Sequence, residues 1–296
     1  MKGPVEPPPQ RQWSELLRLA LDEDLGPGDA TTPLVIPRSQ VGRAVVEARM
    51  PLVVCGLEVA EATIHALDPD ARCVRRSEDG AQASAGEALL EVSGRLTALL
   101  AAERTALNFL MRMCGVATHT QRFVRAIEGT GASIVDTRKT LPGWRVLDKY
   151  ATAVGGARNH RVGLFDGILL KDNHVAAAGG VALAVKAALA NAPANLRVQV
   201  EVESLEDALA AVEAGADFLL LDNQTPSQAR AIVEQLAGRA LLEISGGVTL
   251  DNVRAMAETG VQRISIGALT HSAPAADVAL EIAAEPGQTP ARGVTT

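Results

Sequence analysis

The sequence has few aromatic residues and no excess of positive charge. Phe, Trp and Tyr make up 2% of its 296 residues, so few rings are available to stack on single-stranded bases. The formal net charge is −7 and the isoelectric point is near 5.3, whereas a general nucleic-acid binder needs excess positive charge facing the phosphates. We therefore expect no nucleic-acid partner.

Long hydrophobic runs and cysteine motifs are also missing. No apolar run approaches the roughly 18 residues that span a bilayer, and the first ten residues, MKGPVEPPPQ, have no apolar core typical of a secretory signal. Cys55, Cys73 and Cys114 are far apart in the sequence and show no CxxC or Cys/His metal spacing, which favours reduced, structural thiols. We expect a cytoplasmic protein with no membrane partner.

The first third of the chain has the composition of a mixed α+β unit. Hydrophobic residues make up 47% of the whole chain and charged residues 21%, which is typical of a globular protein. Gly, Pro and Asp separate short strand-like runs from helical ones. We expect a helix from about Ser14, a loop at 26–29, strands at 44–47, 52–55 and 88–92, and helices at 58–66 and 96–113, the last a bridge between domains. Both termini, 3–10 and 285–296, lack periodic apolar residues and are excluded from the fold.

The remainder of the chain alternates strand-like and helical runs. The strand-like runs are SIVD, GILL, RVQVEV, DFLLL, ALLEIS and RISIG, at 133–136, 167–170, 197–202, 217–221, 240–245 and 263–267. A helix-compatible segment follows each of them. This alternation predicts a parallel sheet closed into an α/β barrel.

Polar residues or glycines follow each of these strands. In chain order they are Asp136-Thr137-Arg138-Lys139, Lys171-Asp172-Asn173-His174, Glu201 with Glu203, Asp222-Asn223, Ser245-Gly246-Gly247 and Gly267-Ala268. In an α/β barrel the carboxyl ends of the strands converge on one face, where active sites are built. Solvated loop charges with no common site are the alternative.

Glycine follows the last two strands. Ser245-Gly246-Gly247 and Ile266-Gly267-Ala268 each precede a helical segment, where small residues let backbone N–H groups approach a phosphate. Alone, a Ser-Gly-Gly triplet is more often a turn. Its place after the fifth of six expected strands favours a phosphate site.

Five cationic residues gather within a short part of this acidic chain: Arg138, Lys139, Arg158, Arg161 and Lys171. Neighbouring cations repel one another, and this cost is tolerated where an anion binds, because arginine matches carboxylate and phosphate geometry. A solvated charged face is the alternative. The pattern favours an enzyme that holds a small, multiply negative substrate.

The acids and histidines permit several roles. Glu201 and Asp222 are suited to holding Mg²⁺ beside phosphates or to stabilising positive charge on a sugar carbon, and they are equally suited to capping helices. His160 and His174 are more typical of hydrogen-bonding partners than of proton-transfer residues.

Six motifs resemble one enzyme family. They are Glu103-Arg104-Thr105-Ala106-Leu107-Asn108, Asp136 to Thr140, Asn159-His160-Arg161, Leu170 to His174, Glu201-Val202-Glu203 and Ser245-Gly246-Gly247. In this order they closely resemble quinolinate phosphoribosyltransferases, in register from about Asp22 to Ser272.

The resemblance implies an open, TIM-like α/β barrel of the type II phosphoribosyltransferase class with an N-terminal α/β sandwich domain. We assign 1–115 to the sandwich domain, with 1–10 disordered, 116–272 to the catalytic barrel, and 273–296 to a C-terminal helix or tail returning toward the N-terminal domain. It further implies a homodimer with a shared active site, a requirement for Mg²⁺, and a reaction in which quinolinate and phosphoribosyl pyrophosphate give nicotinate mononucleotide, pyrophosphate and CO2 in NAD biosynthesis.

The resemblance also implies roles for residues at the matched positions. The catalytic residues would be Lys139, Lys171, Glu201 and Asp222. The quinolinate carboxylates would be held by Arg104 of the neighbouring subunit, Arg138, Arg161 and Lys171, with Thr137 and His160 nearby. Lys139 would face phosphoribosyl pyrophosphate, and Glu201 and Asp222 its ribose and metal. The 5′-phosphate would lie against Ser245, Gly246, Gly247, Ile266, Gly267 and Ala268.

One departure and three rival functions remain. The family usually has three glycines before Asn-His-Arg, whereas the third position here is Ala157, which would be strained if it needed a positive φ. Lys171 is also compatible with a Schiff-base aldolase, although that function leaves the arginines unexplained. A non-enzymatic phosphate-binding module would not need paired acids. A relative that acts on another pyridine acid or in molybdenum metabolism remains a further alternative.

Overall fold

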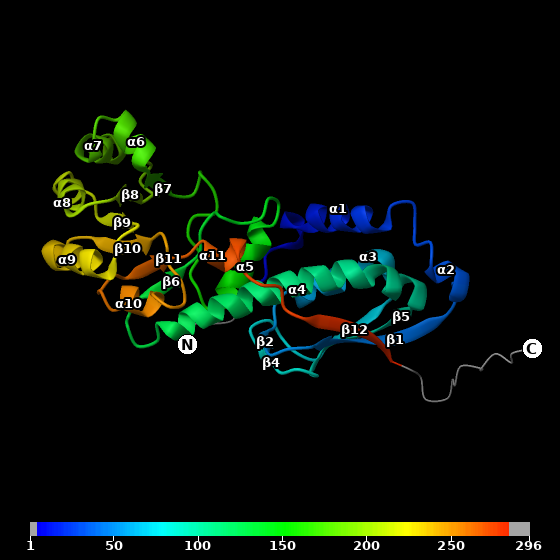
Figure 1. Cartoon of the computed structure of the whole chain (residues 1–296). Coiled ribbons are helices and arrows are strands. Elements are labelled where there is room, and N and C mark those ends of the chain that lie inside the picture. The colour runs from blue at the N-terminus through cyan, green and yellow to red at the C-terminus, as the bar shows by residue number, and fades with distance from the viewer. Residues whose placement is uncertain (1–4, 284–296) are drawn as a thin grey trace, which may run out of the picture. The chain divides into compact units, whose positions relative to one another are not determined.

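The computed structural model describes residues 5–283 of the chain. They form two compact units: one comprises the described residues up to Thr118 and from Pro274 onward, and the other comprises His119–Ala273. The long helix α4 (Leu96–Ala126) contributes residues to both units (Figure 1). None of the helices within 5–283 is long and apolar enough to cross a membrane.

The first unit is built on an antiparallel sheet of four strands in the order β12-β1-β5-β3. These strands are β1 (Val41–Ala48), β3 (Arg72–Arg75), β5 (Ala88–Arg95) and β12 (Val278–Ala283), and β2 (Leu52–Val53) pairs with β4 (Gln82–Ala83). In β1 every second residue from Ala44 is buried, as expected of a sheet with one face against helices. The helices are η1 (Gln10–Gln12), α1 (Ser14–Leu25), α2 (Thr32–Val35), α3 (Leu57–Leu67) and α4.

Two expectations for the ends of the chain are wrong within the described residues. Residues 5–10 were expected to be disordered, but Trp13 is buried and its indole Nε1–H donates to Pro8 O over 3.0 Å, which ties this segment to the unit. The C-terminal segment is not helical where it is described: β12 pairs with β1 and places Ile282 opposite Ala44. Its sequence VALEIA has the alternation of a strand. The predicted tail at 285–296 lies outside the described residues.

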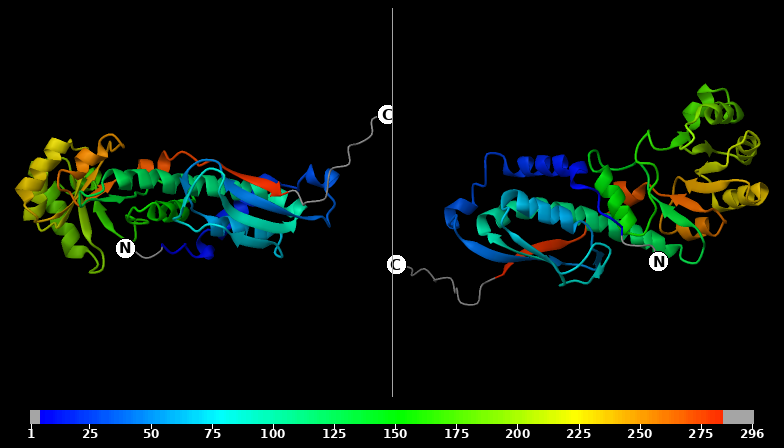
Figure 2. Two further views of the ribbon diagram at one scale, coloured as in Figure 1. Left: turned by 90° about the horizontal axis from the view of Figure 1, so that it is seen from below. Right: turned by 180° about the vertical axis from the view of Figure 1, so that it is seen from behind.

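The second unit contains a parallel sheet of six strands in the order β6-β11-β10-β9-β8-β7. The strands are β6 (Ser133–Val135), β7 (Ile168–Leu170), β8 (Val198–Val202), β9 (Phe218–Asp222), β10 (Leu241–Ser245) and β11 (Arg263–Ser265). Because β6 and β7 are the two edges of the sheet, the barrel is open between them (Figure 2). The prediction of an open α/β barrel is confirmed.

Helices alternate with the strands along the chain of this unit. They are α5 (Arg145–Val154), α6 (Asp172–Ala177), α7 (Val181–Asn191), α8 (Leu205–Glu213), α9 (Pro226–Leu236), α10 (Val253–Ala257) and α11 (Ala268–His271). Local sequence fixes several of their starts: Ser204 caps α8, and Thr225 forms a capping box with Gln228 at the start of α9.

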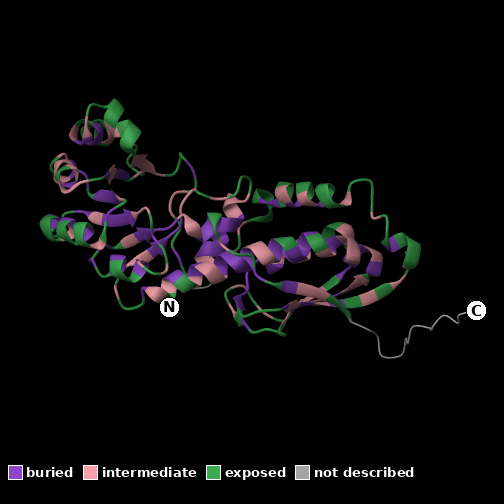
Figure 3. Cartoon of the chain, in the orientation of Figure 1, coloured by how far each residue is buried: buried purple, intermediate pink, exposed green. Residues whose placement is uncertain are grey.

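The two faces of the barrel strands differ in polarity. Residues such as Val200, Leu219 and Ile244 are buried and belong to the hydrophobic core. The ribbon of the barrel unit is largely purple, the colour of buried residues, along its strands (Figure 3). The alternating positions point to the other face. They include polar and charged residues in successive strands, namely Gln199, Glu201, Asp222, Glu243, Ser245, Arg263 and Ser265. The interior of the open barrel is therefore unusually polar.

Candidate active site

Acidic and cationic side chains meet at the carboxyl ends of the barrel strands. Lys171, which follows β7, places its Nζ atom 3.2 Å from Oε2 of Glu201 on β8. Burial raises the pKa of Asp222 at the end of β9, and the nearby Glu201 raises it further, whereas Lys171 and Lys139 lower it. These four side chains therefore lie within electrostatic range of one another, as the strand-end pattern predicted.

The first and last barrel strands also bring their ends together. A Cβ atom added to Gly267 would lie 2.7 Å from Cδ of Lys139, so the lysine side chain passes directly over this glycine. Thr270 donates from Oγ1 to Lys139 O over 2.8 Å, which holds the turn after β6 against α11. Within that turn, Thr137 Oγ1 accepts from Lys139 N over 3.0 Å. Lys139 is thereby placed at the same end of the barrel as Gly267.

Two predicted arginines lie near each other. Burial lowers the pKa of the Arg161 guanidinium, and the positive charge of Arg138 lowers it further, while Asp166 acts in the opposite direction. Arg161 donates from Nη1 to Gly167 O over 3.0 Å, which directs its side chain. Like charges brought together in a partly buried place indicate a site for an anion.

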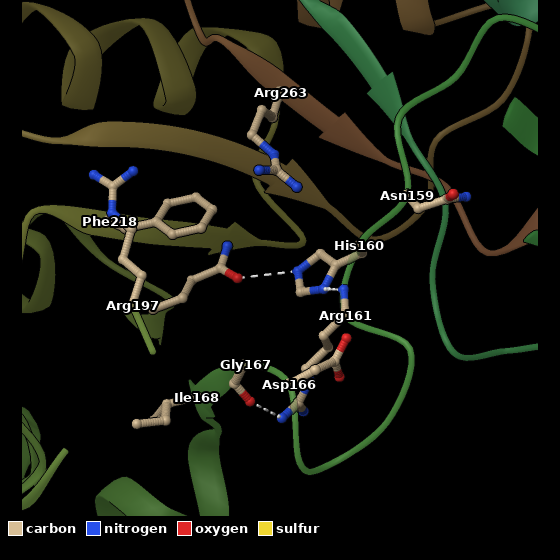
Figure 4. A pocket seen from close by; sticks show the side chains of 10 residues that line it. Asn159, His160, Arg161, Asp166, Gly167, Ile168, Arg197, Phe218 and Arg263 are labelled. Carbon is tan, nitrogen blue, oxygen red and sulfur yellow. Dashed lines mark hydrogen bonds between the residues drawn. The ribbon is translucent and has the colours of Figure 1, made fainter. Parts of the chain in front are cut away.

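His160 points into the barrel interior. Its Nε2 atom lies 3.0 Å from Oε1 of Gln199, and its Nδ1 accepts the backbone N–H of Arg161 over 2.7 Å (Figure 4). Burial lowers the pKa of His160, although Glu243 and Gln199 raise it. Arg161, Arg197, Phe218 and Arg263 are among the other residues around the same cavity, whose volume is about 360 Å³.

Asp136 and Lys149 form a buried anchor beneath this region. Asp136 was grouped with the polar strand ends, but the structure buries it completely, so it does not line the exposed site. Its carboxylate accepts from Lys149 Nζ at 2.6 Å and from the backbone N–H of His160 at 2.7 Å. Thr152 Oγ1 and Asn159 Nδ2 also donate to it. Sequence reasoning missed Lys149, because a lysine within a helix gives no sign of its buried partner.

The glycine-rich strand ends agree only partly with the prediction. Gly246 has a φ of 90°, and a Cβ atom there would lie 2.1 Å from Oδ1 of Asn223, so only glycine fits. A helix does not follow directly: α10 begins at Val253, and Asn252 bridges the intervening loop by donating to Gly247 O. Ile266 does not line this site, because its side chain is in the hydrophobic core and its N–H donates to Val135 O.

The remaining predicted positions have simple local environments. Ser245 ends β10, and its carbonyl accepts from Asn223 N over 2.9 Å. Ala268 is the first residue of α11. His174 caps α6 by accepting the backbone N–H of Lys171 on Nδ1 over 3.0 Å. Arg104 is exposed on α4 and belongs to the first unit.

Ala157 fits the position where three glycines were the usual pattern. Among the described residues, positive φ angles outside glycine occur at Asn223 and Ala237, and Gly156, with a φ of 98°, makes the tight turn before Ala157. The alanine is buried and donates its N–H to Thr152 O over 3.1 Å. The expected strain at this position is therefore not seen.

The acidic side chains at the strand ends offer a metal a pair of ligands, not a complete set. Within 5–283 no group of three or more His, Cys, Asp or Glu side chains is arranged to hold a metal ion. Glu201 and Asp222 nevertheless provide two carboxylates near each other: burial raises the pKa of Asp222 most, and the charge of Glu201 raises it further. A pair of this kind suits Mg²⁺ that takes its other ligands from water and phosphate.

Comparison with known proteins agrees with this geometry. The quinolinate phosphoribosyl transferase N-terminal domain model matches residues 29–114, and the C-terminal domain model of the same family matches 116–281. The nicotinate-nucleotide pyrophosphorylase [carboxylating] of Mycobacterium leprae is 44% identical, covering 90% of this chain and 96% of that protein. A probable enzyme of the same name from Bacillus subtilis is 37% identical, covering 92% and 93%.

Solved structures give the same result. The crystal structure of NadC from Streptococcus pyogenes superposes with a TM-score of 0.90 at 34% identity, covering 94% of this chain and 100% of that one. The nicotinate-nucleotide pyrophosphorylase from Francisella tularensis gives a TM-score of 0.88 at 34% identity, covering 96% and 100%. Sequence and fold therefore agree over both units, and the chain belongs to the quinolinate phosphoribosyltransferase family.

Proposed function

We propose that the chain transfers the phosphoribosyl group of phosphoribosyl pyrophosphate to quinolinate, giving nicotinate mononucleotide, pyrophosphate and CO2 as a step of NAD biosynthesis. The observation that carries this proposal is the grouping of charged side chains within the barrel unit, arginine with arginine and acid with lysine. Arg138 and Arg161 repel one another in a partly buried place, and Glu201 and Asp222 lie beside Lys171. Family membership and the charge of both substrates support the same reaction.

Quinolinate is a dianion, and we assign its two carboxylates to Arg138, Arg161 and Lys171. Guanidinium groups match a carboxylate with two parallel hydrogen bonds, and the lysine contributes a point charge. Thr137 and His160 are proposed to lie beside the ring. Arg104 is proposed to come from the neighbouring subunit of a homodimer, which would complete the cationic site.

Phosphoribosyl pyrophosphate is assigned to other residues at the carboxyl ends of the barrel strands. Lys139 is suited to the pyrophosphate, and Glu201 and Asp222 to the ribose and to Mg²⁺, which supplies charge neutralisation for the leaving group when bound. The 5′-phosphate is assigned to the backbone around Ser245, Gly246, Gly247, Gly267 and Ala268. The two glycine-bearing ends allow close approach of N–H groups to an anion.

The chemistry then needs no protein nucleophile. Positive charge develops on the ribose carbon as pyrophosphate leaves, and Glu201 or Asp222 stabilises it. The ring nitrogen takes up the ribosyl carbon and becomes cationic. Loss of the adjacent carboxylate as CO2 leaves a carbanion that this positive charge stabilises, and a proton replaces the carboxylate on the ring. Lys171 acts as a fixed charge throughout.

The organisation of the enzyme is proposed as well. We assign the catalytic barrel to 116–272 and the sandwich domain to 1–115, and we place the enzyme in the cytoplasm. Cys55, Cys73 and Cys114 are unpaired, which suits a reducing compartment.

The direct test mixes the protein with Mg²⁺, quinolinate and phosphoribosyl pyrophosphate, and measures nicotinate mononucleotide and released CO2. Arg138→Ala and Lys171→Ala are each expected to lose about 10²-fold or more in turnover, the scale for removing a preorganised charge partner. Near-normal turnover in both variants would remove these assignments. Borohydride trapping of a substrate on Lys171 would favour an aldolase instead.

A further inference from the structure

The barrel interior contains a buried carboxylate that the proposed reaction does not use. Glu243 on β10 is 0% exposed and points to the polar face of the strands. Its Oε2 lies 2.8 Å from Nε of Arg263, and its Oε1 lies 3.5 Å from Nε2 of His160. The contact with Arg263 is an ion pair, and neither contact is an aligned hydrogen bond, since both carboxylate oxygens lack a hydrogen-bond partner within the described residues.

Such an arrangement does not stabilise a fold efficiently. Burying a carboxylate costs several kcal/mol, and an ion pair with poor hydrogen-bond geometry repays little of it. Apolar residues of similar volume commonly serve as well in a core. We therefore expect Glu243 to act on a neighbouring residue. Of its neighbours, His160 is the one adjacent to the proposed substrate site.

The hydrogen bonds of His160 define its protonation. Nδ1 accepts the backbone N–H of Arg161 over 2.7 Å, so this atom carries no proton. The ring proton is then on Nε2, which faces Gln199 Oε1 at 3.0 Å and Glu243 Oε1 at 3.5 Å. Two acceptors around Nε2 favour this tautomer over the one with the proton on Nδ1.

The ring and the backbone of His160 are held by different groups. Its N–H donates to Asp136 and its carbonyl accepts from Lys149 Nζ, so the buried anchor fixes the backbone. The ring, by contrast, lies against Gln199 and Glu243 in the barrel interior. A change at Glu243 can therefore alter the ring while leaving the backbone anchor in place.

We propose that Glu243 is a positioning residue that, with Gln199, holds the ring proton of His160 on Nε2, so that Nδ1 stays free to fix the Arg161 backbone for the anionic substrate. This inference rests on the proposed function for the identity of that substrate. Arg161 is the residue through which the effect reaches quinolinate. Glu243 itself touches no substrate.

The proposal has a signature in pH dependence. Around His160, the charged groups are Glu243 from β10, Arg263 from β11 and Lys149 from α5, and Gln199 from β8 completes its surroundings. Protonation of Nδ1 at low pH breaks the bond to Arg161, so the KM for quinolinate rises on the acid side. Because Glu243 raises the pKa of His160, Glu243→Gln shifts this rise to lower pH.

The test uses the full-length protein with ¹⁵N-labelled histidine. The chain has five histidines, and His160→Asn identifies the signals of His160. In the unmodified protein we expect a single tautomer, with Nε2 protonated. Glu243→Gln keeps the shape of the side chain and removes its charge, and we expect a mixture of tautomers and a rise of about tenfold in the KM for quinolinate, the scale of one hydrogen bond to a charged group. The KM for phosphoribosyl pyrophosphate should not change.

Two further variants make the result decisive. Gln199→Met removes the other acceptor at Nε2 with little change of shape, and the same tautomer mixture is expected even if Glu243→Gln fails to fold. Asp68→Asn is the matched control, because Asp68 is also a buried acid paired with an arginine, Arg95, at 3.1 Å in the first unit. It should leave the tautomer and the KM for quinolinate unchanged.

The outcomes separate this inference from the proposed function. A single His160 tautomer and an unaltered KM for quinolinate in both Glu243→Gln and Gln199→Met would overturn it. If the unmodified protein makes no nicotinate mononucleotide, the proposed function fails, while the tautomer measurement still decides whether Glu243 controls the ring.

Discussion

The buried ion pair of Asp136 and Lys149 predicts a large loss of stability when its cation is removed. Asp136 is 0% exposed and Lys149 is 4% exposed, and their charged atoms are 2.6 Å apart. Lys149→Met keeps the length of the side chain but leaves a buried carboxylate without its cation. Removing one partner of a buried pair costs about 3–5 kcal/mol, so we expect a loss of this size in the free energy of unfolding.

The assay is urea unfolding followed by circular dichroism at a fixed protein concentration. The decrease in the free energy of unfolding should appear in the urea transition of the second unit, which contains both residues. Adding Asp136→Asn to Lys149→Met removes the uncompensated charge, and the double variant should be more stable than the sum of the single losses indicates. Arg254→Met is the control, because Arg254 forms an exposed pair with Glu258 and should cost less than about 1 kcal/mol.

The anchor also has a functional consequence, since Asp136 accepts the backbone N–H of His160. In Lys149→Met protein that remains folded, the KM for quinolinate should rise. If Lys149→Met unfolds at the same urea concentration as Arg254→Met, the buried pair does not stabilise the unit and the reasoning from its burial is refuted.

Three further predictions concern the strand ends. Gly246→Ala should destabilise the second unit by about 1–3 kcal/mol and raise the KM for phosphoribosyl pyrophosphate, because alanine is strained at its positive φ; unchanged kinetics and melting would contradict this. Burial and Glu201 raise the pKa of Asp222, so its ionisation opposes folding at neutral pH. Asp222→Asn should therefore raise the melting temperature at neutral pH while lowering turnover, and this gain should vanish below the carboxyl's ordinary titration range. Chelation by EDTA should abolish turnover, and added Mg²⁺ should restore it; full turnover in EDTA would remove the metal assignment.

The sequence predicted much of the fold because the barrel strands carry strong local signals. Runs such as DFLLL and ALLEIS alternate with helical segments, and parallel strands must align their carboxyl ends. The meeting of Lys171 with Glu201 follows from this rule alone. The C-terminal strand was missed because VALEIA suits a helix or a strand, and its pairing partner β1 is more than two hundred residues away in the chain.

The roles of interior residues were harder to predict for a different reason. Glu243 lies in an apolar run, where one charged residue looks like an exposed position on an otherwise buried strand. The available signal was the repetition of polar residues two apart, as in Gln199 with Glu201 and Arg263 with Ser265. A spacing of two places both side chains on the same face of a strand. Which of these residues contact one another depends on the curvature of the barrel, and the sequence does not reveal it.

The opening of the barrel explains why two buried acids act on one short segment. Because β6 and β7 do not pair, the chain between them cannot be fixed by a sheet on both sides. Arg158 forms only a single bridge with β6, at Val135. Side chains must hold the residues that follow, and Asp136 binds the backbone of His160 while Glu243 lies against its ring. Arg161 is thus held in place although it is not part of a strand. Two buried carboxylates destabilise the fold, and this destabilisation is tolerated because it positions an arginine for an anionic substrate.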